Sequence, residues 1–245
     1  MMAGQLAFCA VRQGRRKTPE NGEEPGKIFH EHPPYRIDGR STAFNACDTT
    51  ALFLIGHDAY RRWTGDAGLA ADQQGNIAAA ADYILAHLRE DLFTEDPSLC
   101  GADRFALKVT YWKDSVLHGR PDGAPCYPVV YPLAHVQNLA GLRAAVRLLS
   151  SRPLEDAANR MRDALSRIWD EAAGSFFLAI DRIGPLSGIS SDALHALAFL
   201  ETGDLSPARL DRIVSSSRTL ETPAGYRTLA PELSDRMDNG YHSRT

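Results

Sequence analysis

Apolar residues recur every three to four positions along several stretches of the chain, which is the spacing of helices with one buried face. The first such stretch is CDTTALFLIGHDAYRRWTGD, residues 47–66. Asp48 or Thr49 can cap this helix at its start, and Gly65 can end it. The second stretch is NIAAAADYILAHLRED, residues 76–91. The pattern therefore predicts two consecutive helices in this part of the chain.

Four further stretches show the same pattern. PLAHVQNLAGLRAAVRLLSS begins at Pro132, and PLEDAANRMRDALSRIWDEAAG begins at Pro153 and closes at Gly174, as expected for proline in the first helical turn and glycine after the last. SSDALHALAFLETG and SPARLDRIVSSSRTL each open with a Ser/Asp-type cap. Only SFFLAID, residues 175–181, is β-like. We therefore expect about six helices and an all-α fold.

The connections between these helices alternate in length. Short turns at 65–75, 150–153 and 202–207 group the helices into three hairpins. Long loops cover about 93–131, 173–189 and 219–245, and loops of that length in a compact domain are usually functional. If the hairpins lie side by side, these loops share one end with the N-terminal loop 26–47. We expect residues 1–25 to be a loop or poorly ordered and residues 26–245 to form one domain.

Composition excludes several classes of function. The net charge is -4 and the pI about 6.1, so no basic surface favours nucleic acid or an anionic membrane. No apolar stretch approaches the length of about 18 residues needed to span a bilayer. The four cysteines form no C-x-x-C pair, which favours free thiols in a reducing compartment and predicts a cytoplasmic protein.

Cofactor and metal motifs are absent from the sequence. It contains no G-x-G-x-x-G, Walker loop or G-x-S-x-G, so dinucleotide, phosphate and nucleophile-elbow chemistry lack support. His30 and His32 flank Glu31, which is poor spacing for a shared metal ion. We predict no cofactor and no metal.

The polar residues of the loops fit cleavage of a glycosidic bond. That reaction needs one carboxyl group to protonate the leaving oxygen and another to activate water or attack the sugar. The loops supply carboxylates at Glu31, Asp48, Asp114, Asp235 and Asp238. Most of them also have an ordinary structural explanation: Asp114 as a solvated group beside Lys113, Asp48 as a helix cap, and Asp235 and Asp238 as part of a turn in DRMDNGYH.

Seven segments, taken in order, resemble motifs of one enzyme family. GKIFHEH, ACDTTALFLI, YWKDS and HVQNLAGLRAA match motifs of the types GKIPHE, VDTTPLFL, GWKDS and EVQGYVYAAL. SSDALHALAFLETG, GYRTLAP and NGYHSRT match SNAGHLLWTG, GIRTLA and the start of YHNGSVWP. Over residues 26–245 the chain thus resembles the amylo-α-1,6-glucosidase part of glycogen-debranching enzymes and their six-hairpin glycosidase relatives.

The resemblance implies an (α/α)6 toroid and a glycoside hydrolase that cleaves α-glucosidic bonds of an oligo- or polysaccharide with inversion. It makes Asp114 the general acid, and we expect the Lys113 ammonium to point away from it. The residues that the resemblance assigns to carbohydrate binding are His30, Glu31, Asp48, Tyr111, Trp112, Lys113, Gln137, Arg227 and His242.

Two departures from the family pattern matter. The glutamate of EVQG is His135 in this chain. The family's catalytic base lies beyond the YHNGSVWP segment, within which this sequence ends, and about six of twelve family helices are present. We therefore expect a partial toroid that is weakly active or inactive by itself, with exposed hairpin edges that favour self-association.

Three other functions remain open on the sequence. One is a carbohydrate-binding or scaffold protein on the same helical hairpins, without catalysis. Another is an interaction module built like a helical solenoid, in which the loop residues do not converge. The third is a sugar epimerase or lyase with histidines as acid and base, for which the candidates are His30, His32, His135 and His242.

Overall fold

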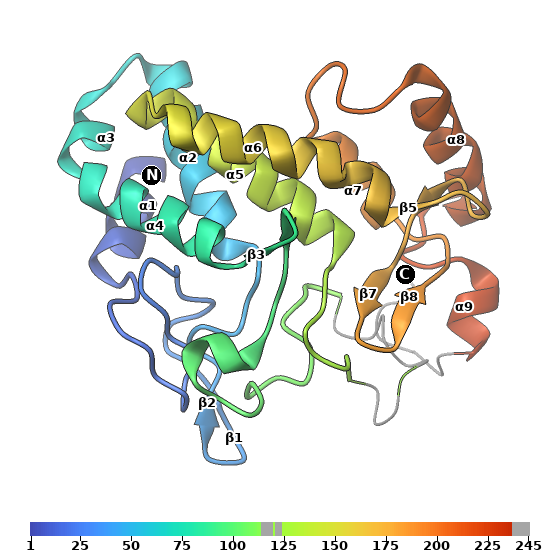
Figure 1. Cartoon of the computed structure of the whole chain (residues 1–245), viewed down its shortest axis with the longest axis horizontal. Helices are drawn as coiled ribbons and strands as arrows, with labels where there is room; N and C mark the ends of the chain where they lie inside the picture. Colours follow the sequence, from blue (N-terminus) through green and yellow to red (C-terminus); the bar gives the residue numbers. More distant parts are fainter. Residues whose placement is uncertain (114–119, 121–123, 237–245) are drawn as a thin grey trace.

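The computed structural model describes residues 1–113, 120 and 124–236 (Figure 1). Its α-helices are α1 (Met2–Val11), α2 (Thr49–Thr64), α3 (Gly68–Asp72), α4 (Gln74–Ala86), α5 (Pro132–Leu149), α6 (Arg152–Asp163), α7 (Asp192–Leu197), α8 (Pro207–Ser217) and α9 (Pro231–Arg236). Its 3-10 turns are η1 (Pro97–Cys100), η3 (Ala164–Ile168) and η4 (Arg218–Leu220). The described part is thus mostly helical, and none of its helices is long and apolar enough to cross a bilayer.

The strands are short and pair only with their neighbours in sequence. Each pair is antiparallel and two-stranded. The pairs are β1 (Arg36–Ile37) with β2 (Arg40–Ser41), β3 (Leu88–Arg89) with β4 (Leu92–Phe93), β5 (Trp169–Asp170) with β6 (Ser175–Phe176), β7 (Ala179–Asp181) with β8 (Gly184–Leu186), and β9 (Glu221–Thr222) with β10 (Gly225–Tyr226).

Several helix boundaries agree with the sequence signals. Helix α2 follows Asp48 and ends at Gly65, which has a φ of 73°, a conformation that glycine adopts without strain. Helix α5 begins at Pro132 as predicted. Helix α8 follows Ser206, whose hydroxyl accepts a hydrogen bond from the backbone amide of Arg209 over 3.3 Å.

The helix expected between Pro153 and Gly174 is shorter than predicted. Helix α6 ends at Asp163, and the chain then passes through η3 into the β5–β6 hairpin. Trp169 and Phe176 face each other across this hairpin, edge to face, with ring centroids 5.7 Å apart. Burial of this aromatic pair is the tertiary contact that overrides the local helical pattern.

The first residues form helix α1 where a loop was expected. Leu6 and Ala10 of this helix are buried in the same hydrophobic core as the rest of the described chain. Leu6 approaches α2 at Gly56, where an added Cβ would lie 3.1 Å from the Leu6 side chain. The apolar residues of the segment therefore drive it onto α2, although the segment lacks a recognisable cap.

Helix α5 lies at the centre of the helical layer. It contacts α2, α4, α6 and α7, and α7 in turn contacts α8. Helices α2 and α5 pack closely at Gly141, where a Cβ would lie only 2.9 Å from the Cα of Ala51. The pairs α2–α4, α5–α6 and α7–α8, expected as hairpins, are each in contact.

The long loops gather on one side of this layer, as expected from the connection lengths (Figure 1). Glu95 and Val129 exchange two backbone hydrogen bonds of 2.8 and 2.9 Å. Val130 and Ile180 do the same over 2.8 and 2.9 Å. These bonds tie segments that are distant in sequence into one loop surface.

Candidate functional site

The N-terminal ends of α2, α5 and α7 lie on the loop side, and residues 110–113 run across them. At α2, the carbonyl of Thr110 accepts a hydrogen bond from the backbone amide of Cys47 over 3.3 Å. At α5, the Tyr111 ring stacks on Tyr131, with centroids 4.7 Å apart and planes 7° from parallel. This segment therefore bridges neighbouring helix ends at the point where the chain leads into Asp114.

Lys113 attaches the same segment to α7. Its side chain is fully buried, and its ammonium forms an ion pair with Asp192 over 3.0 Å. It also donates hydrogen bonds to Ser191 Oγ (3.3 Å) and the Thr228 carbonyl (2.9 Å). Burial lowers the pKa of Lys113, and the Asp192 carboxylate opposes that shift. The ammonium is thus engaged by groups of the protein itself.

Trp112 lies between the two anchored residues and remains 39% exposed. Its ring meets Tyr111 edge to face at 6.3 Å. The His195 ring lies 5.5 Å from it at an angle of 48°. A partly exposed indole supported by two further rings is a surface on which a sugar ring can stack.

Asp48 stands directly before α2, but its side chain does not cap the helix by a hydrogen bond to the first turn. Burial raises the pKa of the Asp48 carboxyl group, and the charge of Glu95 acts in the same direction. The backbone amides of Asp48 and Thr49 and the nearby His30 oppose the shift. The Asp48 carboxyl group is therefore partly buried and lies close to the first residue of α2.

Glu31 and His30 belong to the loop before α2. The Thr42 hydroxyl donates a hydrogen bond to Glu31 Oε1, and His30 Nδ1 lies 3.8 Å from the same oxygen. Across residues 1–113 and 124–236, no group of three or more His, Cys, Asp or Glu side chains is placed to hold a metal ion. The geometry places Glu31, His30 and Asp48 in one neighbourhood.

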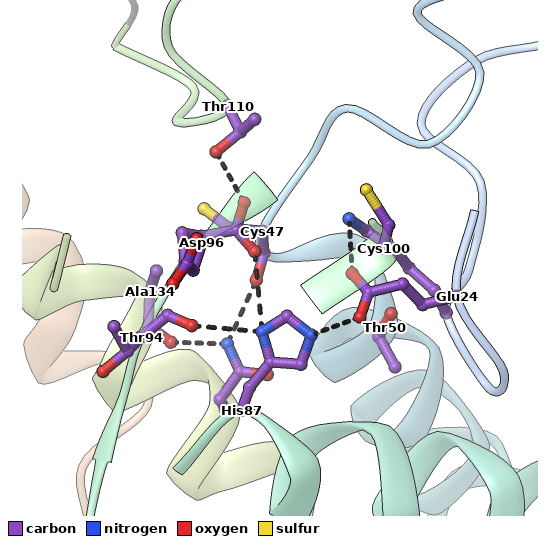
Figure 2. A network of polar contacts seen from close by, with 12 residues as sticks. Glu24, Cys47, Thr50, His87, Thr94, Asp96, Cys100, Thr110 and Ala134 are labelled. Atoms are coloured by element: carbon purple, nitrogen blue, oxygen red, sulfur yellow. Dashed lines mark hydrogen bonds and ion pairs between the residues drawn. The ribbon is translucent and has the colours of Figure 1, made fainter. Parts of the chain in front are cut away.

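A buried polar layer lies beneath the 110–113 segment (Figure 2). Glu95 accepts a 2.8 Å hydrogen bond from the Thr110 hydroxyl. The His87 ring contacts a Glu24 oxygen at Nε2 and the Thr94 carbonyl at Nδ1, both over 3.1 Å. Both ring nitrogens thus lie within hydrogen-bond distance of oxygen atoms from other segments.

Glu24 is the buried carboxylate that contacts the His87 ring in that layer. Burial acts to raise the pKa of Glu24, but the hydrogen bond and charge of His87, together with Lys27, hold it below the usual value. The layer is therefore a set of buried polar groups that contact one another, and through Thr110 it supports the segment that carries Tyr111 and Trp112.

Asn138 connects α5 to the residue before Asp48. Its side-chain amide donates to the Cys47 carbonyl over 3.1 Å and to the Ala134 carbonyl over 2.8 Å. Because Asn138 is fully buried, the bond to Cys47 fixes the backbone before α2, and the bond to Ala134 holds the side chain on α5. This contact crosses 91 positions of sequence.

His135 is held in its neutral form. The backbone amide of Phe93 donates to its Nδ1 over 3.1 Å, so Nδ1 is the acceptor and Nε2 carries the proton toward the Met161 carbonyl, 3.1 Å away. Burial lowers the pKa of His135 from 6.5 to about 4. These contacts give His135 a structural role, which argues against it as the acid or base of an epimerase or lyase.

Two more of the expected substrate residues lie in the described part. Gln137 is buried on α5, and its Oε1 has no hydrogen-bond partner among the described residues. Arg227 is half-buried and its backbone amide donates to the Leu220 carbonyl over 2.8 Å. Its neighbour Thr228 is the residue whose carbonyl binds Lys113.

Asp114 and His242 lie outside the described residues. Sequence reasoning missed Asp192, Glu95 and His195, which border the 110–113 segment. Asp192 has the signature of a helix start, and Glu95 lies in a stretch without periodicity. Neither pattern reveals a buried partner far along the chain.

A pocket of about 600 Å³ opens in the described part of the chain, but none of the expected substrate residues lines it. Phe105, Tyr127, Cys126 and Arg182 are among the residues that line it. Tyr127 also donates its hydroxyl proton to the Lys108 carbonyl over 3.3 Å. The volume lies in the range of known small-molecule sites.

Comparison with known proteins finds similarity at the level of structure. No protein-family model matches the sequence, and a search of curated proteins finds no match. An uncharacterized conserved protein from Thermus thermophilus aligns with a TM-score of 0.63 and 13% identity over 94% of this chain and 69% of its own.

Two crystal structures of the GH63 mannosylglycerate hydrolase from Thermus thermophilus align as well. The complex with glucose gives a TM-score of 0.61 and 12% identity over 94% of this chain and 70% of that one. The complex with Tris and D-glycerate gives a TM-score of 0.58 and 14% identity over 89% of this chain and 68% of that one. Neither of these is a glycogen-debranching enzyme. The described chain therefore has a helical fold similar to that of a GH63 glycoside hydrolase.

Proposed function

We propose that this protein is a glycoside hydrolase that cleaves α-glucosidic bonds, with Asp114 as the general acid. One observation carries the proposal: residues 110–113 bridge the N-terminal ends of three neighbouring helices and place Trp112 at the surface immediately before Asp114. The fold similarity to a GH63 hydrolase supports the same class of reaction.

The helix order also supports a toroidal arrangement. Helices α2, α5 and α7 are neighbours in that order and are the inner helices in the proposed (α/α)6 toroid, while α4, α6 and α8 are the outer ones. In such a layout the loops that follow the outer helices converge over the ends of the inner ones. Those loops carry the candidate substrate residues.

The described residues have distinct tasks in this proposal. Trp112 stacks against a glucosyl ring, while Glu31, His30 and Asp48 bind its hydroxyl groups. Asp114 protonates the leaving oxygen as the glycosidic bond breaks. A second carboxylate, which the sequence resemblance places after the YHNGSVWP-like segment, activates water on the opposite face of the sugar, so that the anomeric configuration inverts.

The substrate class rests on the sequence resemblance and on the structural neighbours. The resemblance indicates α-glucans or α-glucosides. The GH63 neighbour is seen in complexes with glucose and with D-glycerate. We infer that the sugar bound next to Trp112 is glucose.

The proposal is tested by hydrolysis of maltose and isomaltose, without and with sodium azide as an external nucleophile. Asp114→Asn should lower the rate by about 10²- to 10⁴-fold, the usual contribution of a general acid. Asp72→Asn, an exposed carboxylate on α3, is the matched control and should keep the wild-type rate.

Calorimetry with the same sugars distinguishes a hydrolase from a protein that only binds carbohydrate. Binding by the wild type and Asp114→Asn without turnover by either would favour the carbohydrate-binding alternative. Full activity of Asp114→Asn would exclude Asp114 as the acid.

A further inference from the structure

The buried ammonium of Lys113 joins three parts of the loop surface. Asp192 and Ser191 lie at the start of α7, and Thr228 lies in the loop before α9. An unpaired ammonium in the interior is very costly, so a fully buried lysine requires such partners. All three partners come from positions more than 70 residues further along the chain.

The two partner elements are already joined without Lys113. The backbone amide of Ser191 donates to the Thr228 carbonyl over 3.0 Å, and Ser190 pairs with Leu229 in an antiparallel bridge. The Thr228 carbonyl thus accepts from both Ser191 and Lys113. Lys113 therefore attaches the 110–113 segment to two segments that already bind each other.

Asp192 is oriented for this pairing. Its second carboxylate oxygen, Oδ2, accepts the Ser190 hydroxyl over 3.0 Å, which leaves Oδ1 facing Lys113. Burial and the charge of Asp192 raise the pKa of the Tyr111 hydroxyl. Tyr111, two residues before Lys113, therefore lies close to the same carboxylate.

The ion pair of Lys113 affects the candidate site because Lys113 lies between Trp112 and Asp114 in the sequence. Trp112 precedes it, and the ammonium lies 4.8 Å from the centroid of the indole ring. Asp114 follows it directly. We propose that Lys113 and Asp192 are positioning residues that hold the Trp112-bearing segment on α7, and that Lys113 does not contact the sugar. This inference rests on the proposed function for its effect on catalysis, and on geometry alone for the position of Trp112.

The test uses the full chain and three variants: Lys113→Met, Asp192→Asn and the double variant. The ion pair between Arg143 and Asp204 is the matched control, with two hydrogen bonds of 2.6 and 2.7 Å and only 14% and 3% side-chain exposure. It is far from the site, about 18 Å along α5 from Tyr131.

Thermal unfolding first measures how much each variant loses in stability, before any change in the position of Trp112 is examined. Lys113→Met leaves the Asp192 carboxylate, and Asp192→Asn the Lys113 ammonium, buried without the opposite charge, so the melting temperature of both single variants should fall. The double variant removes both charges and should recover most of that loss. The Arg143→Met, Asp204→Asn and double control variants should follow the same order.

Fluorine NMR of chains labelled with 5-fluorotryptophan then reports on Trp112, with the three resonances assigned by single Trp→Phe variants. In the Lys113→Met/Asp192→Asn chain the Trp112 resonance should shift toward that of the exposed Trp63. In the Arg143→Met/Asp204→Asn chain it should stay in place. An unchanged Trp112 resonance in the stable Lys113→Met/Asp192→Asn chain would overturn the proposal.

Kinetics provide the second readout. Because a displacement of about 1 Å can cost about 10²-fold, kcat should fall by about 100-fold in the Lys113→Met/Asp192→Asn chain while KM changes little. Recovery of kcat together with melting temperature would show a purely structural role and contradict the proposal. If the wild type hydrolyses no α-glucoside, the proposed function fails, and the fluorine spectra still decide the role of the ion pair.

Discussion

Replacing His135 with leucine should destabilise the protein at neutral pH and reduce its sensitivity to acid. At neutral pH the imidazole accepts a hydrogen bond from the buried Phe93 amide, which leucine cannot do. An unsatisfied buried donor costs about 1–3 kcal/mol. The His135→Leu chain should therefore be less stable than the wild type by about that amount at neutral pH.

The difference should shrink as the pH falls. His135 has its pKa lowered from 6.5 to about 4, so between these values the unfolded chain binds a proton that the folded chain does not. The contribution of neutral His135 to the free energy of unfolding is fully present above pH 6.5 and is lost as the pH falls toward about 4. The loss is about 1.4 kcal/mol at roughly pH 5.5 and about 2.6 kcal/mol at roughly pH 4.5.

The leucine variant escapes this loss because it has no titrating group at that position. The stability gap between wild type and variant should close, or change sign, at about pH 4.5. His57, whose pKa is also lowered to about 4 by burial, is present in both chains and cancels in the difference.

Urea unfolding followed by circular dichroism at several pH values measures the gap directly. A gap that stays constant from neutral pH to about pH 4.5 would refute the neutral, hydrogen-bonded state assigned to His135.

Three further substitutions probe the helical layer and the site. Gly141→Ala should cost about 1–3 kcal/mol in urea unfolding, because its Cβ would lie 2.9 Å from the backbone of α2. Asn138→Ala should cost a similar amount of about 1–3 kcal/mol, since two bonds to buried carbonyls are lost, and it should also weaken maltose binding in calorimetry. Trp112→Ala should weaken that binding about tenfold through lost stacking, whereas Trp63→Ala, at the exposed end of α2, should leave it unchanged. A stable Gly141→Ala chain, or equal sugar affinity in the two tryptophan variants, would contradict these expectations.

Local signals in the sequence predicted the elements whose ends are set by a single residue. Gly65 ends α2 and Pro132 begins α5 because backbone geometry alone dictates those positions. The end of α6 was not predictable in this way, because it depends on Trp169 packing against Phe176 in a hairpin that no local rule requires.

The candidate site likewise combines features that local sequence predicted with features that depend on tertiary contacts. The connection lengths indicated the loops, and the resemblance of YWKDS to a family motif indicated the residues from Tyr111 to Lys113. It could not indicate that Lys113 pairs with Asp192, or that Thr110 binds Glu95, because both depend on how distant loops meet. Asp48 shows the limit most clearly: its position before α2 suggested a cap, but no local pattern indicated that burial raises the pKa of its carboxyl group.

The configuration of the first product tests the central claim most directly. Proton NMR of the protein acting on maltose in the presence of azide distinguishes the two anomers as they form. If Asp114 protonates the leaving oxygen at the site beside Trp112, the product formed from the non-reducing glucosyl unit is β-configured, either β-glucose or β-glucosyl azide, and it disappears in Asp114→Asn but not in Asp72→Asn. An α-configured product from the non-reducing unit, or a β-product that persists in Asp114→Asn, would contradict an inverting α-glucosidase with this acid.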